Sequence, residues 1–368
     1  MTVATAYSGN KQVKEAVSEI QGQLSAVSAK MVVYFASSAY APQELAAAMQ
    51  SAFPGTVVFG CSTAGELISG KMLKGNIVAM AFDKDVIADV AVEVVTGIRT
   101  GGSLRPTFAA FEDYYDITMH KADPGKYVGV VLFDGLSCAE ERMMEKIGDF
   151  SDVTFIGGSA GDDLKFTATY VFANGRAYRD AAVLALIKAG GRFDVIKTQS
   201  FSSLGKKLVA TKVDEKTRTV FEFDGKPAAE AYAAAIGRSV DDLPNFFMQH
   251  PLGLMVDGEP FVRSPQQVKD GSVVFYCNVK EGMELEVLQA RDIVQGTIRA
   301  IKEKEAEIGK LKAMVNFNCI LRTLQLQSEG KTEAYGKVFA DVPTIGFSTY
   351  GEAYIGHINQ TATILVFA

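Results

Sequence analysis

The chain has 368 residues, and at roughly 150 residues per domain this length predicts two domains. Apolar residues make up 48% of the sequence and charged residues 22%, a composition typical of folded globular proteins that excludes an intrinsically disordered chain. The 37 basic and 43 acidic residues give a net charge of −6 without any basic block, which excludes a protein that binds nucleic acid by neutralising phosphates.

One arrangement of apolar and polar residues occurs three times along the chain. It consists of an apolar run, a helical stretch, a second apolar run, and a turn in which glycine and serine precede an acidic residue. The first copy spans Val32 to Glu66, the second spans Val130 to Asp162, and a more diverged third copy runs from Met314 to Glu352. The first two copies are almost equal in length, which indicates duplication.

Each copy predicts a strand, a helix and a second strand parallel to the first, because a crossover of this length is too long for a hairpin. The stretches after the turns alternate or are β-branched, and Asn174–Gly175 predicts the tight turn of an antiparallel hairpin. The predicted fold class is therefore α/β, with two domains whose mixed sheets are built from repeated strand–helix–strand units flanked by antiparallel hairpins. Further helices are expected at Lys11 to Ala29, Leu104 to Tyr115, Pro227 to Ile236 and Ala290 to Ile308.

The boundary between the two domains is expected within Phe201 to Lys207, where the apolar periodicity stops. An N-terminal domain of residues 1–203 would then hold the first two copies, and a C-terminal domain of residues 204–368 would hold the third.

The repeated turn suits the binding of a small polar ligand. It follows a strand at the edge where α/β folds bind ligands, and its glycines allow backbone N–H groups to converge. The alternative is a sharp structural corner whose side chains satisfy local backbone groups. The candidate ligand-binding residues of the turns are Ser62, Thr63, Glu66, Ser348, Thr349, Gly351 and Glu352.

Two arginines, Arg263 and Arg322, interrupt apolar runs of the predicted second domain. An arginine in such a place needs a partner, either an internal acid such as Glu352 or the carboxylate of a ligand. We expect a ligand pocket in or near this domain, where Asn359 and Thr361 would join the two arginines and the third turn.

Histidine and serine chemistry offers two further hypotheses. Only three histidines are present, and His250 and His357 lie in or beside apolar segments, where a buried imidazole is either hydrogen-bonded or an axial ligand of haem. Residues 157–161 match G-x-S-x-G, so Ser159 would be the nucleophile of a hydrolase with one of these histidines as base. The hairpins expected after the turn weigh against that hypothesis, and the sequence has no Walker or dinucleotide-binding motif.

The cellular context is expected to be the cytoplasm. The four cysteines lie far apart without zinc-finger spacing, the N-terminus lacks the pattern of a secretion signal, and no stretch reaches the 18 apolar residues typical of a membrane span. We therefore expect reduced thiols and neither a membrane nor a nucleic-acid partner.

Several of these motifs together resemble the FIST family, named for F-box and intracellular signal transduction proteins. The resemblance covers nearly the whole chain. It rests on GCSTAGE in the first copy, GGSAGDD in the second, HPLGL from His250, FVRSP around Arg263, FNCILR up to Arg322, GFSTYGE in the third copy and the closing NQT from Asn359.

The resemblance implies a ligand-binding input module of signalling, proposed to bind small molecules such as amino acids and commonly joined to kinase, cyclase or chemoreceptor domains. The chain is similar to stand-alone bacterial members, which include nitric-oxide-sensing proteins described as binding haem and acting on a histidine kinase. We therefore predict a cytoplasmic sensor, not an enzyme, that binds an amino-acid-like metabolite and signals through a partner such as a histidine kinase or cyclase. The ligand carboxylate would lie on Arg263 or Arg322 and its amine near Glu352. A haem-based nitric-oxide sensor is the alternative, and the Ser159 hydrolase is a weaker one.

Overall fold

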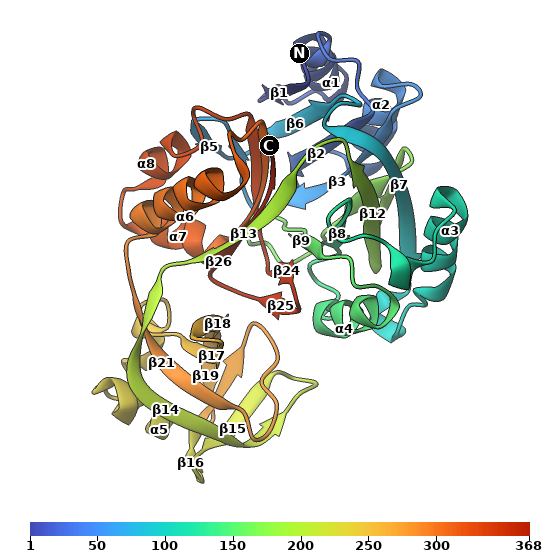
Figure 1. Cartoon of the computed structure of the whole chain (residues 1–368). Coiled ribbons are helices and arrows are strands. Elements are labelled where there is room, and N and C mark those ends of the chain that lie inside the picture. Colours follow the sequence, from blue (N-terminus) through green and yellow to red (C-terminus); the bar gives the residue numbers. More distant parts are fainter. The chain divides into compact units, whose positions relative to one another are not determined.

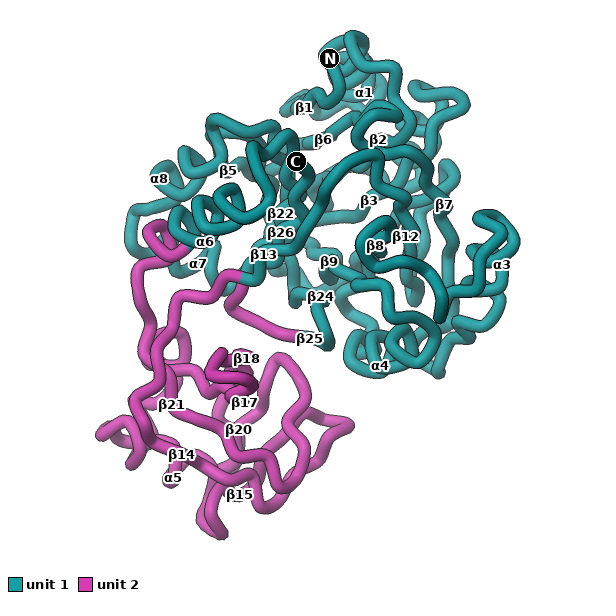
Figure 2. The backbone as a smooth tube through the Cα atoms, in the orientation of Figure 1, with its two compact units in different colours: residues 1–197, 297–357, 362–368 teal, residues 198–296, 358–361 magenta.

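Two compact units make up the protein in the computed structural model, which describes all of residues 1–368 (Figure 2). Unit 1 contains residues 1–197, 297–357 and 362–368, and unit 2 contains residues 198–296 and 358–361. This division differs from the expected single cut after residue 203. The third copy belongs to the same unit as the first two because its strands share their core, and most of unit 2 is an insertion ahead of that copy.

Unit 1 consists of three repeats of one arrangement, which is longer than the three copies visible in the sequence (Figure 1). Along the chain, each repeat has an edge strand, a helix, two parallel strands joined by a helical connection, and a two-stranded hairpin. A last strand then pairs between the edge strand and the first parallel strand. The first repeat comprises β1 (Val3–Ser8), α1 (Val13–Leu24), β2 (Met31–Ser37), α2 (Pro42–Ala52), β3 (Val57–Thr63), the hairpin β4 (Glu66–Ile68) and β5 (Lys71–Leu73), and β6 (Ile77–Phe82). The second comprises β7 (Ile87–Thr96), α3 (Arg105–Tyr115), β8 (Tyr127–Phe133), α4 (Glu140–Phe150), β9 (Phe155–Ser159), the hairpin β10 (Val171–Ala173) and β11 (Arg176–Tyr178), and β12 (Ala181–Ala189). The third comprises β13 (Phe193–Gln199), α6 (Ile293–Ile308), β22 (Ala313–Cys319), α7 (Ile320–Ser328), α8 (Thr332–Lys337), β23 (Thr344–Thr349), the hairpin β24 (Glu352–Tyr354) and β25 (His357–Ile358), and β26 (Thr361–Phe367).

The three repeats exchange their hairpins in a cycle. The strand orders of the sheets are β1-β6-β2-β3-β10-β11, β7-β12-β8-β9-β24-β25 and β13-β26-β22-β23-β4-β5. The hairpin of the second repeat thus completes the sheet of the first, the third completes the second, and the first completes the third. Each sheet contains one parallel pair together with antiparallel pairs, so the predicted mixed sheets are confirmed.

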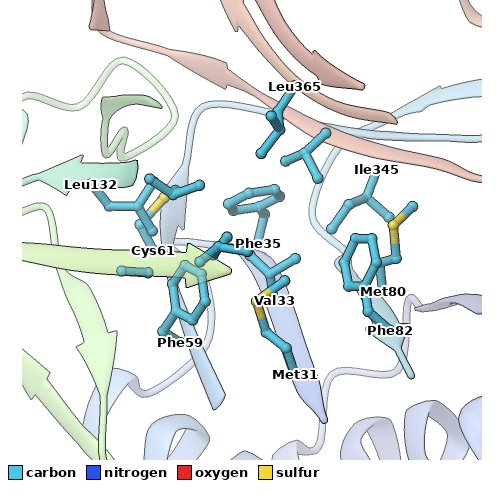
Figure 3. Packing of buried hydrophobic residues seen from close by; sticks show 14 of the residues in the cluster. Met31, Val33, Phe35, Phe59, Cys61, Met80, Phe82, Leu132, Ile345 and Leu365 are labelled. Carbon is cyan, nitrogen blue, oxygen red and sulfur yellow. The ribbon is translucent and has the colours of Figure 1, made fainter. Parts of the chain in front are cut away.

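The core of unit 1 lies where the inner faces of the three sheets meet. Phe35, Leu132 and Phe317 occupy equivalent inward positions in the three repeats and belong to one continuous apolar cluster. Figure 3 shows Phe35 and Leu132 in this cluster. The Phe35 ring lies 4.5 Å from Phe347 and 6.2 Å from Phe317. Helices α1 and α2 cover the outer face of the first sheet, and α3 and α4 cover that of the second. Burial on both faces explains the unbroken apolar runs of these strands.

One position in each parallel pair accepts only glycine. A Cβ atom at Gly60 would lie 1.8 Å from the carbonyl oxygen of Tyr34 on the neighbouring strand. The corresponding distances are 1.7 Å from Gly157 to Val131 and 2.2 Å from Gly346 to Asn316. Such distances are shorter than any non-bonded contact, and they place the three repeats in one common register.

Unit 2 is built on one antiparallel sheet in the order β18-β17-β21-β14-β15-β20-β19, with β16 paired to β15. Its core contains side chains from the sheet and from α5, and Tyr232 and Phe223 are fully buried there. No helix of either unit is long and apolar enough to cross a membrane. The elements are β14 (Phe201–Asp214), β15 (Thr219–Phe223), β16 (Lys226–Pro227), α5 (Ala228–Ile236), β17 (Leu252–Val256), β18 (Glu259–Arg263), β19 (Pro265–Lys269), β20 (Ser272–Phe275) and β21 (Glu284–Ala290).

Candidate functional site

The three repeated turns meet at one end of the parallel strand pairs of unit 1. Equivalent backbone hydrogen bonds join them in a ring. The N–H of Ala64 donates to the carbonyl of Ser348 at 3.2 Å, that of Gly161 to Ser62 at 2.9 Å, and that of Tyr350 to Ser159 at 3.1 Å. The turns that were predicted to form a ligand cradle therefore lie side by side.

The polar side chains of the turns mostly bond to other groups of the turns. The Ser62 hydroxyl donates to the carbonyl of Gly161 at 2.8 Å, and the Thr349 hydroxyl donates to that of Gly351 at 2.6 Å. The Thr63 hydroxyl donates to the Glu66 carboxyl at 2.5 Å. These bonds match the structural-corner interpretation of the turns, in which serine and threonine satisfy local backbone groups.

Glu66 is a buried acid of the first turn with a perturbed pKa. It is 1% exposed, and burial raises its pKa to about 7, although the hydrogen bonds from the Thr63 hydroxyl and the Asn76 N–H lower the pKa. A carboxyl in this state exchanges its proton near neutral pH.

A cavity of about 220 Å³ opens in unit 1 beside the first and second turns. Ala64 and Gly65 of the first turn line it together with helix α7 and the hairpin strand β5. Apolar side chains form much of its wall, and five residues contribute polar groups. These five are Lys74, Asp163, Thr323, Gln327 and Thr332. None of the binding residues predicted from the sequence lines the cavity directly, but the Ser348 hydroxyl lies 2.8 Å from that of Thr323.

Asp163, a residue of the cavity wall, has one oxygen without a hydrogen-bond partner. Its Oδ2 atom accepts hydrogen bonds from the hydroxyls of Ser37 at 3.2 Å and Ser38 at 2.9 Å. Its Oδ1 atom is buried and has no hydrogen-bond partner. Buried carboxylate oxygens nearly always have a donor, so this atom indicates a site for a cationic or N–H group.

The loop that carries Asp163 has a strained backbone. Asp163, Leu164 and Phe166 have φ values of 57°, 64° and 51°, a region that side chains of this size rarely occupy. Asp162 holds the loop, because its carboxylate accepts the N–H groups of residues 166–168 and the Tyr350 hydroxyl. Burial raises the pKa of Asp162, yet the four hydrogen bonds outweigh it and leave the pKa below its ordinary value. Strain of this kind is concentrated at functional sites.

Arg322 is a buried cation with neutral partners. It is 1% exposed, its Nε atom donates to the Asn318 side chain and its Nη2 atom to the Thr297 hydroxyl, both at 3.0 Å. Its Nη1 atom has no hydrogen-bond partner. The internal ion pair considered for Arg322 is therefore not among its contacts. Asn318 also donates to Thr323, which connects Arg322 to the cavity wall.

The outer face of β22 explains how this arginine is accommodated. Asn316 and Asn318 stand on this face, at positions that hold Tyr34 and Ala36 in the first repeat. The second repeat has Val131 and Phe133 there. The third repeat has thus replaced an apolar contact between sheet and helix with buried polar groups, including the Tyr335 hydroxyl that donates to Asn318 at 2.9 Å.

The other predicted binding residues belong to unit 2. Arg263 is half-buried, its Nη1 atom donates to the carbonyl of Val262 at 3.4 Å, and its Nε atom has no partner. Asn359 and Thr361 are buried in the segment 358–361, and the Asn359 Oδ1 atom has no partner. Arg322 and the three turns lie in unit 1.

The two candidate histidines have different surroundings. The Nδ1 atom of His250 lies 3.2 Å from the carbonyl oxygen of Leu288. His357 is 5% exposed and lies against the Glu141 carboxylate and the backbone of Gly351. An axial haem ligand faces an apolar cleft wide enough for the macrocycle, whereas the donors beside His357 are carboxylates.

Ser159 does not have the surroundings of a nucleophile. It is 1% exposed, and its hydroxyl donates to the Glu140 carboxylate at 3.0 Å instead of to a histidine. A nucleophilic serine needs an adjacent base and access to the substrate.

Asp163 and Lys74 line the cavity but were not predicted from the sequence. Gly60, Gly157 and Gly346 occupy the same position in the three repeats. Counted from these glycines, Asp163 and not Asp162 lies at the position of Glu66 and Glu352, so the sequence did contain a signal for Asp163. Lys74 directly follows the hairpin strand β5 and carries no comparable signal.

Two family models match the chain, and the boundary between them falls inside unit 2. The model of the FIST N domain matches residues 30–226, and that of the FIST C domain matches residues 228–354. An uncharacterized protein of Methanocaldococcus jannaschii is 25% identical over 284 residues, which cover 70% of this chain and 53% of that protein. The chain therefore spans about half the length of this relative. Because the two models match most of the sequence, the chain belongs to the FIST family, whose domains are recognised as sensor domains of signal transduction.

Proposed function

We propose that this FIST protein senses a small zwitterionic metabolite of the amino-acid type in the cavity of unit 1. The observation that carries the proposal is Asp163, a residue of the cavity wall whose buried Oδ1 atom has no hydrogen-bond partner. An ammonium group of the ligand would supply the missing donor in a charge-assisted hydrogen bond. This assigns to Asp163 the role that the sequence suggested for Glu352.

The ligand carboxylate has two cations nearby. Lys74 lines the cavity directly, and the Arg322 guanidinium lies behind its wall with only neutral hydrogen-bond partners. An uncompensated buried cation creates a positive potential in a medium of low dielectric constant, and this potential favours an anionic group in the cavity. Lys74 would then contact the carboxylate, while Arg322 would act through Asn318 and Thr323.

The size of the cavity supports a small metabolite. Sites for drug-sized ligands measure roughly 300–1,000 Å³, whereas this cavity measures about 220 Å³. The apolar residues Leu73, Ile320 and Leu324 line it as well and would contact an aliphatic side chain.

Ligand binding would be passed on to a separate protein by contact, and a histidine kinase or a cyclase is the partner we propose. The loop of residues 162–166 supports this step, because it lines the cavity through Asp163 and Leu164 and exposes Leu164 and Phe166 by 38% and 55%. A ligand that bonds to Asp163 would bias the conformation of these exposed side chains. No comparable observation supports the two alternatives, a haem sensor and a hydrolase.

Binding of amino acids and related metabolites to the purified protein tests the proposal. We expect at least one of them to raise the Tm and to bind in calorimetry. Asp163→Asn should weaken that ligand by about 10- to 100-fold, since a hydrogen bond to a charged group contributes about 1.5–3 kcal/mol. Asp113→Asn, at an exposed position of α3, is the matched control and should leave binding unchanged.

Two results would contradict the proposal. One is a complete panel without any stabilising ligand, and the other is a ligand whose Kd is the same for the wild type and Asp163→Asn. A second pair of variants tests the contact between Lys74 and the ligand carboxylate. Lys74→Met should weaken binding of the ligand, whereas Lys14→Met on the exposed face of α1 should not.

A further inference from the structure

A second group of chemically active side chains lies in unit 1, away from the cavity. Glu140 and Glu141 open helix α4, Ser159 ends strand β9, and His357 opens strand β25. The hairpin exchange brings His357 of the third repeat to the sheet of the second. One ligand atom from each of Glu140, Glu141 and His357 lies within 4.8 Å of the other two.

The imidazole of His357 lacks hydrogen bonds. The residue is 5% exposed, and neither of its ring nitrogens has a hydrogen-bond partner. Its Nδ1 atom faces the Oε1 atom of Glu141 at 3.2 Å. A buried imidazole normally uses at least one nitrogen in a hydrogen bond, so this ring points to a ligand of another kind.

Gly351 fixes the position of this ring. A Cβ atom at Gly351 would lie 1.8 Å from the Nε2 atom of His357, so the imidazole packs directly against the glycine backbone. This contact leaves Nδ1 as the nitrogen that faces the Glu141 carboxylate. It also gives Gly351 of the third turn a role that the sequence did not indicate.

We propose that Glu140, Glu141 and His357 bind a divalent transition-metal ion, with Zn²⁺ as the preferred ion. The separation of 3.2 Å between Nδ1 and Oε1 suits two ligands of one ion, because ligand distances of about 2.0–2.1 Å at tetrahedral angles place two ligands roughly 3.3 Å apart. One imidazole nitrogen and two carboxylate oxygens form a donor set that favours Zn²⁺ over the oxygen-seeking Ca²⁺ and Mg²⁺. The two carboxylates also neutralise the charge of the ion.

The Ser159 hydroxyl completes the surroundings of the site. It donates to Glu140 at 3.0 Å and so orients that carboxylate, as outer partners of metal ligands commonly do. The ion would join the start of α4 in the second repeat to the hairpin of the third. None of these residues lines the cavity proposed for the metabolite, so the metal site stands independently of the proposed function.

Calorimetry with ZnCl₂ on chelator-treated, desalted protein tests the site. We expect one ion per chain and a rise of Tm in its presence. His357→Asn should raise the Kd for Zn²⁺ by at least about 100-fold, since it removes a direct ligand. His120→Asn, at an exposed position, is the matched control and should bind Zn²⁺ as the wild type does.

Glu141→Gln keeps the test decisive if the histidine variant fails to fold. Glu141 is partly exposed, so this variant retains most of its packing, and we expect it to weaken Zn²⁺ binding while circular dichroism shows an unchanged fold. Absence of Zn²⁺ binding by the wild type, or an unchanged Kd in either variant, would overturn the proposal. Binding of Mg²⁺ or Ca²⁺ more tightly than Zn²⁺ would overturn it as well.

Discussion

Replacement of Glu66 by glutamine should change how the stability of the protein depends on pH. Glu66 is buried in the first turn, accepts hydrogen bonds from the Thr63 hydroxyl and the Asn76 N–H, and has a pKa of about 7. Glutamine has nearly the same shape and can accept from Asn76 and donate to Thr63, but it does not ionise. The variant therefore isolates the charge of this carboxyl from its packing.

The magnitude follows from the difference between the folded and unfolded pKa values. The ordinary value of a glutamate is 4.5 and that of folded Glu66 is about 7, a difference of about 2.5 pH units. At 1.36 kcal/mol per pH unit this corresponds to about 3 kcal/mol. Because the folded state holds the proton more tightly, the contribution to stability is fully present below pH 4.5 and is lost as the pH rises to about 7.

Urea unfolding of the wild type and Glu66→Gln between about pH 4 and 8 measures this effect. The two proteins should have similar free energies of unfolding near pH 4, whereas the variant should be more stable by about 3 kcal/mol near pH 8. Glu303→Gln, at an exposed position of α6, should differ from the wild type by the same small amount at every pH. A difference between the wild type and Glu66→Gln that does not change with pH would refute the reasoning.

Two further substitutions test the packing of unit 1. Gly157→Ala should abolish folding or cost more than about 4 kcal/mol, because its Cβ would lie 1.7 Å from the carbonyl oxygen of Val131. Gly148→Ala in α4 meets no atom within 4 Å and should raise the free energy of unfolding by about 0.5–1 kcal/mol, so equal effects of the two in urea unfolding would contradict the assigned register. Tyr350→Phe removes the hydroxyl that donates to Asp162 and accepts from Leu164, and it should cost about 1–3 kcal/mol in the same assay. A cost below about 0.5 kcal/mol would show that this hydroxyl does not hold the loop.

Local structure followed closely from the sequence. The four additional helices were expected at segments where α1, α3, α5 and α6 occur, and the turn at Asn174–Gly175 connects β10 to β11 with φ values of 53° and 71°. Apolar periodicity and turn residues act over a few positions, so a single sequence contains this information.

The arrangement of the repeats did not follow from the sequence. The alternation of apolar and polar residues in a short hairpin indicates that its two strands pair with each other, but it does not indicate which sheet the hairpin joins. Each hairpin of unit 1 joins the sheet of another repeat. The same limit applies to the site. Arg322 was recognised as a buried cation, but its neutral partners Asn318 and Thr297 come from β22 and α6, and no local pattern connects these segments.

The cyclic exchange of hairpins has a consequence for the origin of the protein. One repeat taken alone would leave its sheet two strands short and its hairpin without a neighbour, while three repeats leave no hairpin unpaired. Three separate copies of a single-repeat chain could close the same ring as a symmetric trimer. The single chain thus has the closed connectivity of a three-subunit ring, and the large insertion and the buried polar groups on the sheet face occur in its third repeat alone.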